Sequence, residues 1–140
     1  MKIFQKEITL KQRKRGFHLI TDEVVQAVPE LKDINVGFAN ILIKHTSASL
    51  SINENADPTV RRDMEKFFTD VVPEEINYYK HTHEGLDDMT AHIKASIIGC
   101  SLNVPITKGR FNLGVWQGIY LCEHRNSSGE RQIVVTLYGE

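Results

Sequence analysis

The run Val36-Gly37-Phe38-Ala39-Asn40-Ile41-Leu42-Ile43 contains one polar side chain in eight residues. It is too apolar to alternate cleanly between a solvent-facing and a core-facing side, which is typical of a strand covered on both faces. We therefore predict a central strand over residues 35–44. This strand delivers His45 at its end.

Segments with strand character lie on both sides of this run. They mix apolar and β-branched residues with polar ones and cover residues 3–10, 16–21, 101–106, 113–122 and 131–138. A glycine-rich turn through Lys108-Gly109-Arg110 and a loop at Ser127-Ser128-Gly129 separate the last three. The final third of the chain is therefore predicted to be strand-rich.

Three segments have helical spacing and a residue suited to cap them. Asp22 precedes the first, over residues 23–28. Asp57-Pro58 opens the second, whose apolar stripe consists of Val60, Met64, Phe67, Phe68 and Val71. Asp87 precedes the third, which runs from Asp88 to Ile98, is ended by Gly99, and has an apolar side of Met89, Ile93, Ala95 and Ile97. Residues 77–86 are predicted to form a long loop, and such loops often carry function.

Strands precede, separate and follow these helices without a regular βαβ alternation. This order predicts an α+β fold, a largely antiparallel β-sandwich with about three helices. The chain has 140 residues and a mass of 16.0 kDa. That size fits one domain over residues 1–140.

Charge and cysteine content narrow the class of protein. The 17 basic and 18 acidic residues give a net charge of −1, so there is no basic field that would favour nucleic acid as a partner. The one cationic run, Lys11-Gln12-Arg13-Lys14-Arg15, is interpreted as a solvated surface loop. Cys100 and Cys122 lie among apolar residues and are expected to be buried free thiols.

The amino-terminal residues lack the apolar region of a signal peptide, and no apolar run approaches the roughly 18 residues of a membrane span. We therefore expect a soluble, cytoplasmic protein with no membrane partner.

Six histidines are the main candidates for chemistry. Neutral imidazole is the commonest protein ligand for zinc, and the pool is His45, His81, His83 and His92. His81 and His83 would point to one side if their segment is extended, and Asp88 and His92 stand at i and i+4 on a predicted helix. Either pair could supply two ligands. Neither is a strong motif, and exposed or hydrogen-bonded histidines are the alternative.

Two further segments carry polar or aromatic groups. The hydroxyls of His45-Thr46-Ser47-Ala48-Ser49-Leu50-Ser51 could bind phosphate or carboxylate, or they could satisfy backbone groups in local turns. In residues 109–118, Trp116 could stack on a flat ring and Gln117 could read its edge, or Trp116 could be a core residue. A serine hydrolase is not expected, because there is no G-x-S-x-G.

Longer motifs in the chain resemble the YjbQ family. They are His45-Thr46-Ser47-Ala48-Ser49, Asn53-Glu54-Asn55-Ala56-Asp57-Pro58, His92-Ile93-Lys94 and the stretch from Ser101 through Gly114-Val115-Trp116-Gln117. Val115 stands where the family pattern usually has Thr. The resemblance spans nearly the whole chain and implies a β-rich sandwich with helices, assembled as a homotrimer.

The resemblance also implies a function and a set of site residues. It implies a secondary thiamine-phosphate synthase activity, which joins an aminopyrimidine diphosphate to a thiazole phosphate, with the primary role unknown. The implied histidines are His45, His81 and His92, acting as acid–base groups or holding a divalent metal. The resemblance places Trp116 and Gln117 near them. For the synthase reaction our own hypothesis is that Ser47, Ser49 or Asn55 bind phosphate oxygens and that Lys108 and Arg110 neutralise the departing diphosphate.

The candidate functions require different metals. Three imidazoles suit Zn²⁺, whereas diphosphate chemistry normally uses Mg²⁺ with oxygen ligands. A metal-dependent hydrolase of a small phosphorylated or amide substrate is therefore the rival to the synthase. A non-catalytic trimer that binds a metabolite or a metal is the third reading.

Overall fold

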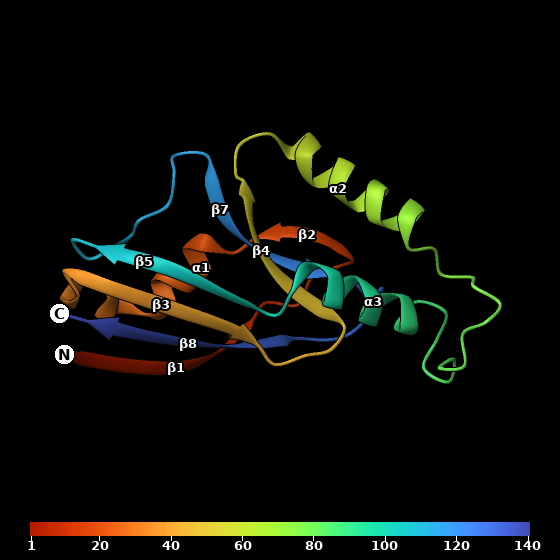
Figure 1. The fold of residues 1–140 in the computed structure, drawn as a ribbon, viewed down its shortest axis with the longest axis horizontal. Helices are drawn as coiled ribbons and strands as arrows, with labels where there is room; N and C mark the ends of the chain where they lie inside the picture. Colours follow the sequence, from red (N-terminus) through yellow and green to blue (C-terminus); the bar gives the residue numbers. More distant parts are fainter.

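The computed structural model describes residues 1–140, which form two antiparallel sheets, with two helices on the smaller sheet and a third helix packed at the core between the sheets (Figure 1). The five-stranded sheet has the order β1-β8-β3-β5-β6 and the three-stranded sheet the order β2-β7-β4. The predicted α+β sandwich is confirmed. The strands are β1 (Lys2–Leu10), β2 (Gly16–Leu19), β3 (Val36–Ile43), β4 (Ala48–Glu54), β5 (Ser101–Thr107), β6 (Arg110–Phe111), β7 (Gln117–Glu123) and β8 (Arg131–Gly139).

Strand β3 lies in the middle of the larger sheet, between β8 and β5. Its central position is confirmed, but the expected cover on both faces is wrong for the single chain. Ala39, Ile41 and Ile43 are buried, whereas Phe38 and Leu42 are 48% and 40% exposed. Phe38 packs on Tyr138 of the neighbouring strand, so the outer face of the sheet is apolar and open.

Strand β7 belongs to two cores because its side chains alternate. Ile119 and Leu121 join the core between the two sheets. Tyr120 and Cys122 point the other way and pack with Phe17. The second core lies between the smaller sheet and the helices, because Met64, Phe68 and Ile98 pack on it.

The helices are α1 (Thr21–Ala27), α2 (Pro58–Val71) and α3 (Asp88–Ile98), with a short 3₁₀ helix, η1, at Pro29–Asp33. The predicted cap of α2 is confirmed, since the Asp57 side chain accepts from the Thr59 N–H at 2.9 Å. Asp22 is not a cap, because α1 begins one residue earlier, at Thr21. The predicted stripe of α2 is only partly covered, because Phe67 and Val71 remain more than half exposed.

The buried face of α3 differs from the predicted one. Asp88, Ala91 and Lys94 are buried, whereas Ile97 is 58% exposed. Asp87 is the residue before α3 but makes no cap hydrogen bond, because its carboxylate accepts from the Arg125 side chain and the Asn126 N–H. The hydrogen bonds of Asp87 with Arg125 and Asn126 therefore set the orientation of this helix.

Other local predictions have mixed outcomes. Cys122 is a buried free thiol whose pKa burial raises to about 12, but Cys100 is exposed. The 11–15 loop is confirmed as a loop, although Arg15 is held in ion pairs. Residues 44–54 were not expected to form a strand, yet their second half is β4. None of the helices combines the length and apolar character that a bilayer crossing requires.

Candidate functional site

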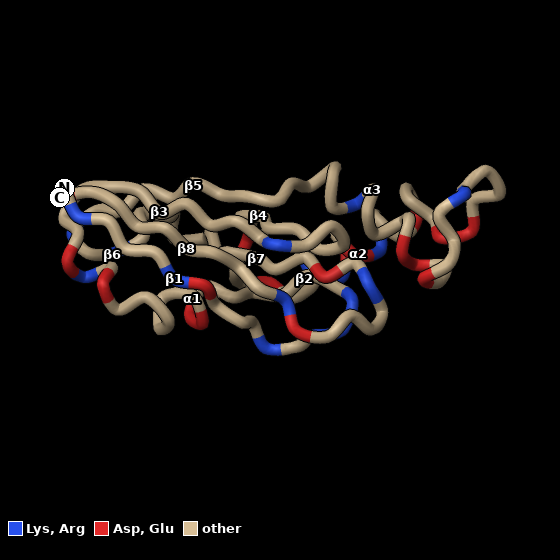
Figure 2. Tube along the Cα trace, turned by 90° about the horizontal axis from the view of Figure 1, so that it is seen from below, with Lys and Arg blue, Asp and Glu red and all other residues tan.

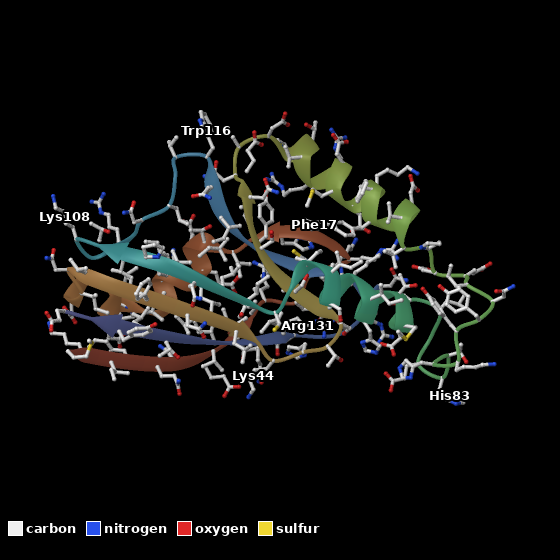
Figure 3. All side chains as sticks on the ribbon, in the orientation of Figure 1. Phe17, Lys44, His83, Lys108, Trp116 and Arg131 are labelled. Atoms are coloured by element: carbon white, nitrogen blue, oxygen red, sulfur yellow. The ribbon has the colours of Figure 1, made fainter.

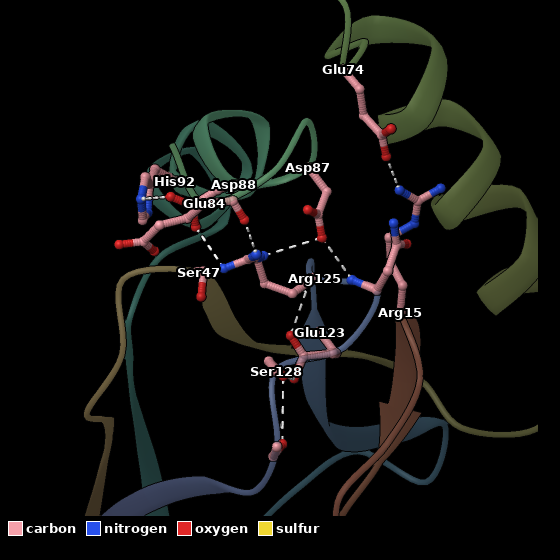
Figure 4. A network of polar contacts seen from close by, with 12 residues as sticks. Arg15, Ser47, Glu74, Glu84, Asp87, Asp88, His92, Glu123, Arg125 and Ser128 are labelled. Atoms are coloured by element: carbon pink, nitrogen blue, oxygen red, sulfur yellow. Dashed lines mark hydrogen bonds and ion pairs between the residues drawn. The ribbon is translucent and has the colours of Figure 1, made fainter. Parts of the chain in front are cut away.

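Asp88, at the start of α3, is the centre of a polar cluster (Figure 4). Its side chain is 2% exposed. Its Oδ2 atom lies 2.7 Å from Nε2 of His81 and 3.1 Å from Nε2 of His92. His92 is one turn further along the same helix, and His81 comes from the 72–87 loop. His81, from the His81/His83 pair, and His92, from the Asp88/His92 pair, therefore both reach this carboxylate.

The tautomer of His92 follows from its other ring nitrogen. Nδ1 lies 2.8 Å from the carbonyl oxygen of Thr46, and a carbonyl only accepts, so Nδ1 carries a proton. A neutral His92 then has a lone pair on Nε2, directed at the Asp88 carboxylate. Two lone pairs facing each other are unfavourable. A proton or a metal cation between them removes the conflict.

Arg125 holds the two aspartates in place. Its Nη1 donates to Oδ1 of Asp88 at 2.8 Å and its Nε to Oδ2 of Asp87 at 3.1 Å. Its Nη2 donates to the carbonyl oxygen of Glu84 at 2.8 Å, which fastens the loop (Figure 4). Burial alone would raise the pKa of Asp87, but the Asn126 N–H and the Arg125 guanidinium outweigh it and lower that pKa.

The donor atoms of His81, Asp88 and His92 all lie within 4.8 Å of one another. Ligands about 2.0–2.1 Å from a tetrahedral Zn²⁺ are roughly 3.4 Å apart. The two contacts of Asp88, at 2.7 and 3.1 Å, would therefore lengthen by roughly 0.3–0.7 Å to admit an ion. The surroundings also match a metal centre, because ligating histidines usually donate their second nitrogen to a carbonyl and ligating carboxylates are hydrogen-bonded in turn. Two imidazoles and one carboxylate suit Zn²⁺, Mn²⁺ or Fe²⁺.

A cavity of about 360 Å³ adjoins the cluster on the side of His81. We call it the histidine cavity. It is lined by Glu74, Glu75, Ile76, Asn77, Tyr79, His81, Thr82, Gly85, Leu86 and Met89. Its size fits a small molecule. The predicted long loop thus forms most of its wall.

The structure does not bring His45 into this cluster. Its Nε2 accepts the N–H of Gln132 at 2.9 Å, at the start of β8. Burial, with a further contribution from the Arg131 charge, lowers the pKa of His45. His45 is therefore a neutral ring, engaged elsewhere in this chain. His83 is exposed at the tip of the loop (Figure 3).

Ser47 and Ser49 are buried and already hydrogen-bonded. Ser47 accepts from Nη2 of Arg131, whose guanidinium also pairs with the buried Glu123 at 2.6 Å. Ser49 lies 2.8 Å from Nε2 of His124, on the helix side of the smaller sheet. Burial lowers the pKa of His124 to about 3. These hydroxyls stabilise buried polar groups within the chain.

The other predicted binding residues lie away from the histidines. Trp116 precedes β7, whereas Arg125 follows its end, and a strand of that length spans roughly 20 Å. The Trp116 side chain is 64% exposed. Asn55 and Gln117 line a separate cavity of about 500 Å³. Lys108 and Arg110 lie at the far hairpin, and Figure 3 shows Trp116 and Lys108 well apart from His83.

Sequence reasoning missed Arg125 as the residue that organises the site. Its place in a loop after a strand gives no local signal. The Asp88–His92 spacing was noticed, and it is the part of the site that helix geometry could reveal. The partner from the loop required the fold.

Comparison with known proteins agrees with this architecture. The model of the UPF0047 protein YjbQ-like family matches residues 6–140. UPF0047 protein YjbQ of Escherichia coli O157:H7 is 52% identical over 137 residues, which cover 98% of this chain and 99% of that protein. UPF0047 protein YugU of Bacillus subtilis is 41% identical over 118 residues, 84% of this chain and 87% of that protein.

Solved structures show the same fold. A YbjQ-like protein of unknown function from Sulfolobus solfataricus P2 superposes with a TM-score of 0.86 at 26% identity, covering 99% of each chain. An uncharacterised YjbQ/UPF0047 protein from Clostridium acetobutylicum gives 0.80 at 35% identity, covering 96% of this chain and 99% of that one. From its sequence and its fold, the chain belongs to the YjbQ-like UPF0047 family.

Proposed function

We propose that the protein is a divalent-metal-dependent hydrolase of a small substrate, with the metal held by His81, Asp88 and His92. The observation that carries the proposal is the convergence of three donor atoms, from a helix and a loop, beside the histidine cavity. A metal ion bound there would polarise a substrate oxygen or lower the pKa of a bound water to about 7.

The chain's own residues prepare the ligands for that role. The Thr46 carbonyl fixes the tautomer that presents Nε2 of His92. Arg125 orients Asp88 and fastens the loop. His81 both reaches Asp88 and lines the cavity, so a substrate there would lie next to the ion. Asn77, Tyr79 and Thr82 offer polar contacts to it.

Elemental analysis and a hydrolase screen test the proposal. We expect the wild type, reconstituted with Zn²⁺ or Mn²⁺, to hold about one ion per chain and to turn over a phosphoester or amide substrate. His92→Ala should lose both ion and turnover. His83→Ala removes an exposed imidazole from the same loop and should retain both. Absence of ion binding would refute the metal centre, and ion binding without turnover of any substrate would favour a non-catalytic metal-binding protein.

Thiamine-phosphate synthase activity is the second candidate. The exposed Trp116 beside the cavity of Asn55 and Gln117 supports it, since an indole there is free to stack on a heteroaromatic ring. Within one chain Trp116 is distant from Asp88, so we propose that a neighbouring copy in a homotrimer completes the synthase site. Trp116→Ala should then abolish synthase turnover, with Mg²⁺ supplied, and leave the hydrolytic activity intact.

The open apolar face of the larger sheet supports the proposed homotrimer. Ile3, Phe38 and Tyr138 are all exposed on strands that pair with one another. Exposed apolar patches of this kind mark contact surfaces between proteins. A cytoplasmic location stays a prediction.

A further inference from the structure

A groove between β2 and α2 gathers basic side chains that the proposed function does not use. Its volume is about 430 Å³. The lining comes from two segments some fifty residues apart in the sequence and consists of Arg15, Gly16, Phe17, His18, Arg61, Arg62, Glu65, Lys66 and Thr69. Figure 2 shows basic residues around β2 and α2, with acidic ones among them. We call it the basic groove.

The charges of the basic groove are unbalanced. Four guanidinium or ammonium groups line it and only one carboxylate, that of Glu65. Glu65 is paired with Arg15 at 3.0 Å. Lys66 pairs with Asp70 at 2.7 Å, with both side chains more than half exposed, and no carboxylate lies within ion-pair distance of Arg61 or Arg62. Arg15 also pairs with Glu74, so the cations of the groove without a carboxylate partner are Arg61 and Arg62.

The helix places its basic residues where they repel one another. Arg62 and Lys66 stand at i and i+4, and like charges at this spacing destabilise a helix. The Arg61 guanidinium is held in place by a buried residue, because its Nη1 donates to the hydroxyl of Tyr120 at 3.3 Å and Tyr120 is 2% exposed. One guanidinium is thus oriented in advance while two further cations extend beside it. An anion in the groove would relieve the repulsion.

The chemistry of the lining selects a phosphate-bearing ligand. Guanidinium groups bind phosphate oxygens through paired hydrogen bonds, and the volume matches a small-molecule site. Phe17, the only Phe, Tyr or Trp of the lining, is 7% exposed, and the partly buried His18 ring is tied to the carbonyl oxygen of Lys14 at 2.7 Å. The lining therefore offers no free Phe, Tyr or Trp ring to stack on a nucleobase, which disfavours single-stranded nucleic acid. We propose that the basic groove binds the polyphosphate group of a small molecule, through Arg61, Arg62 and Lys66.

Calorimetric titration with inorganic triphosphate tests this proposal, with EDTA present so that a metal in the histidine cluster cannot hold the anion. We expect one triphosphate per chain, bound more weakly as salt rises. The variant Arg62→Gln/Lys66→Gln should lose at least tenfold in affinity. Lys6→Gln/Lys32→Gln removes the same charge from exposed lysines outside the groove and should bind as the wild type does.

Three results would overturn the proposal. The first is no heat of binding at low salt. The second is an equal loss in both double variants, because the attraction would then belong to overall charge. The third is a single-stranded oligonucleotide that binds the wild type more tightly than triphosphate does, because the groove would then serve a nucleic acid. Equal unfolding temperatures for the variants and the wild type exclude misfolding as the cause of any loss.

Discussion

His92 and Thr46 are joined by a hydrogen bond of 2.8 Å between Nδ1 and the carbonyl oxygen. This bond connects the helix of the histidine cluster to the segment between β3 and β4. It determines which ring nitrogen faces Asp88, so the backbone of one segment sets the chemistry of another.

Arg125→Lys should weaken metal binding by about 10–100-fold, because partners that orient metal ligands contribute that much. Lysine cannot reach both aspartates and the Glu84 carbonyl at once. Competition titration with a chelator measures the change. Arg13→Lys, in the partly exposed pair with Glu23, is the matched control and should bind metal normally. Equal affinity in both variants would remove Arg125 from the site.

The stability of the protein should fall as the pH drops below about 6.5, in part through His124. Its folded-state pKa is lowered to about 3, so between the two pKa values only the unfolded state takes up this proton. The contribution approaches 1.4 kcal/mol per pH unit. Urea unfolding at pH 6.5, 5.5 and 4.5 should give a shallower dependence for His124→Gln. Ser51→Ala, which removes a hydroxyl on β4, should retain the wild-type slope.

Glu123→Gln should lower the free energy of unfolding at pH 7 by about 3–5 kcal/mol, because it leaves the Arg131 guanidinium buried without its counterion. Burial would raise the pKa of Glu123, but the hydrogen bonds from Arg131 and Ser128 outweigh it and lower that pKa. The ionised pair is therefore present at neutral pH and is lost in acid. Glu23→Gln, in a more exposed pair, should cost less than about 1 kcal/mol. Similar losses for both would contradict the structure.

Lys94→Met should stabilise the protein. The Lys94 side chain is 1% exposed with no carboxylate within ion-pair distance, and burial lowers its pKa. A methionine of similar shape removes the cost of burying the charge. We expect the free energy of unfolding to rise by about 1 kcal/mol. Thermal unfolding measures it. A large loss of stability instead would mean that the ammonium is needed to balance Glu65 and Glu74.

Phe38→Asp should dissociate the proposed trimer into folded monomers. Phe38 lies on the open face of the larger sheet and contributes nothing to the inter-sheet core. Light scattering after gel filtration gives the mass, and circular dichroism checks the fold. Gln26→Asp places the same charge on an exposed position of α1, off the open face of the larger sheet, and should leave the mass unchanged. A wild-type chain that is already monomeric would refute the trimer.

The sequence was sufficient for features that depend on local rules. The central position of β3 follows from its apolar run, and the start of α2 follows from Asp57-Pro58. The 72–87 loop follows from its polar composition. Strand β4 escaped notice because its serines alternate with apolar residues, so a half-buried strand looked like a polar turn.

The buried face of α3 could not be predicted from periodicity. An apolar side of Ile93 and Ile97 was available, yet Asp88 and Lys94 are buried. Burial of Asp88 becomes favourable because Arg125, 37 residues further along the chain, donates to it. The same long-range contact explains why the candidate site contains Asp88 where His45 was expected. The residues around Asp88 in the sequence do not indicate that Arg125 is its partner.

The two-sided packing of strand β7 affects how the protein unfolds. Its odd-numbered residues close one apolar interior and its even-numbered ones another. Loss of this strand would expose both hydrophobic cores at once, so we expect the two cores to unfold together and not one after the other. Heat or denaturant should produce one transition, with fluorescence and circular dichroism reporting the same midpoint.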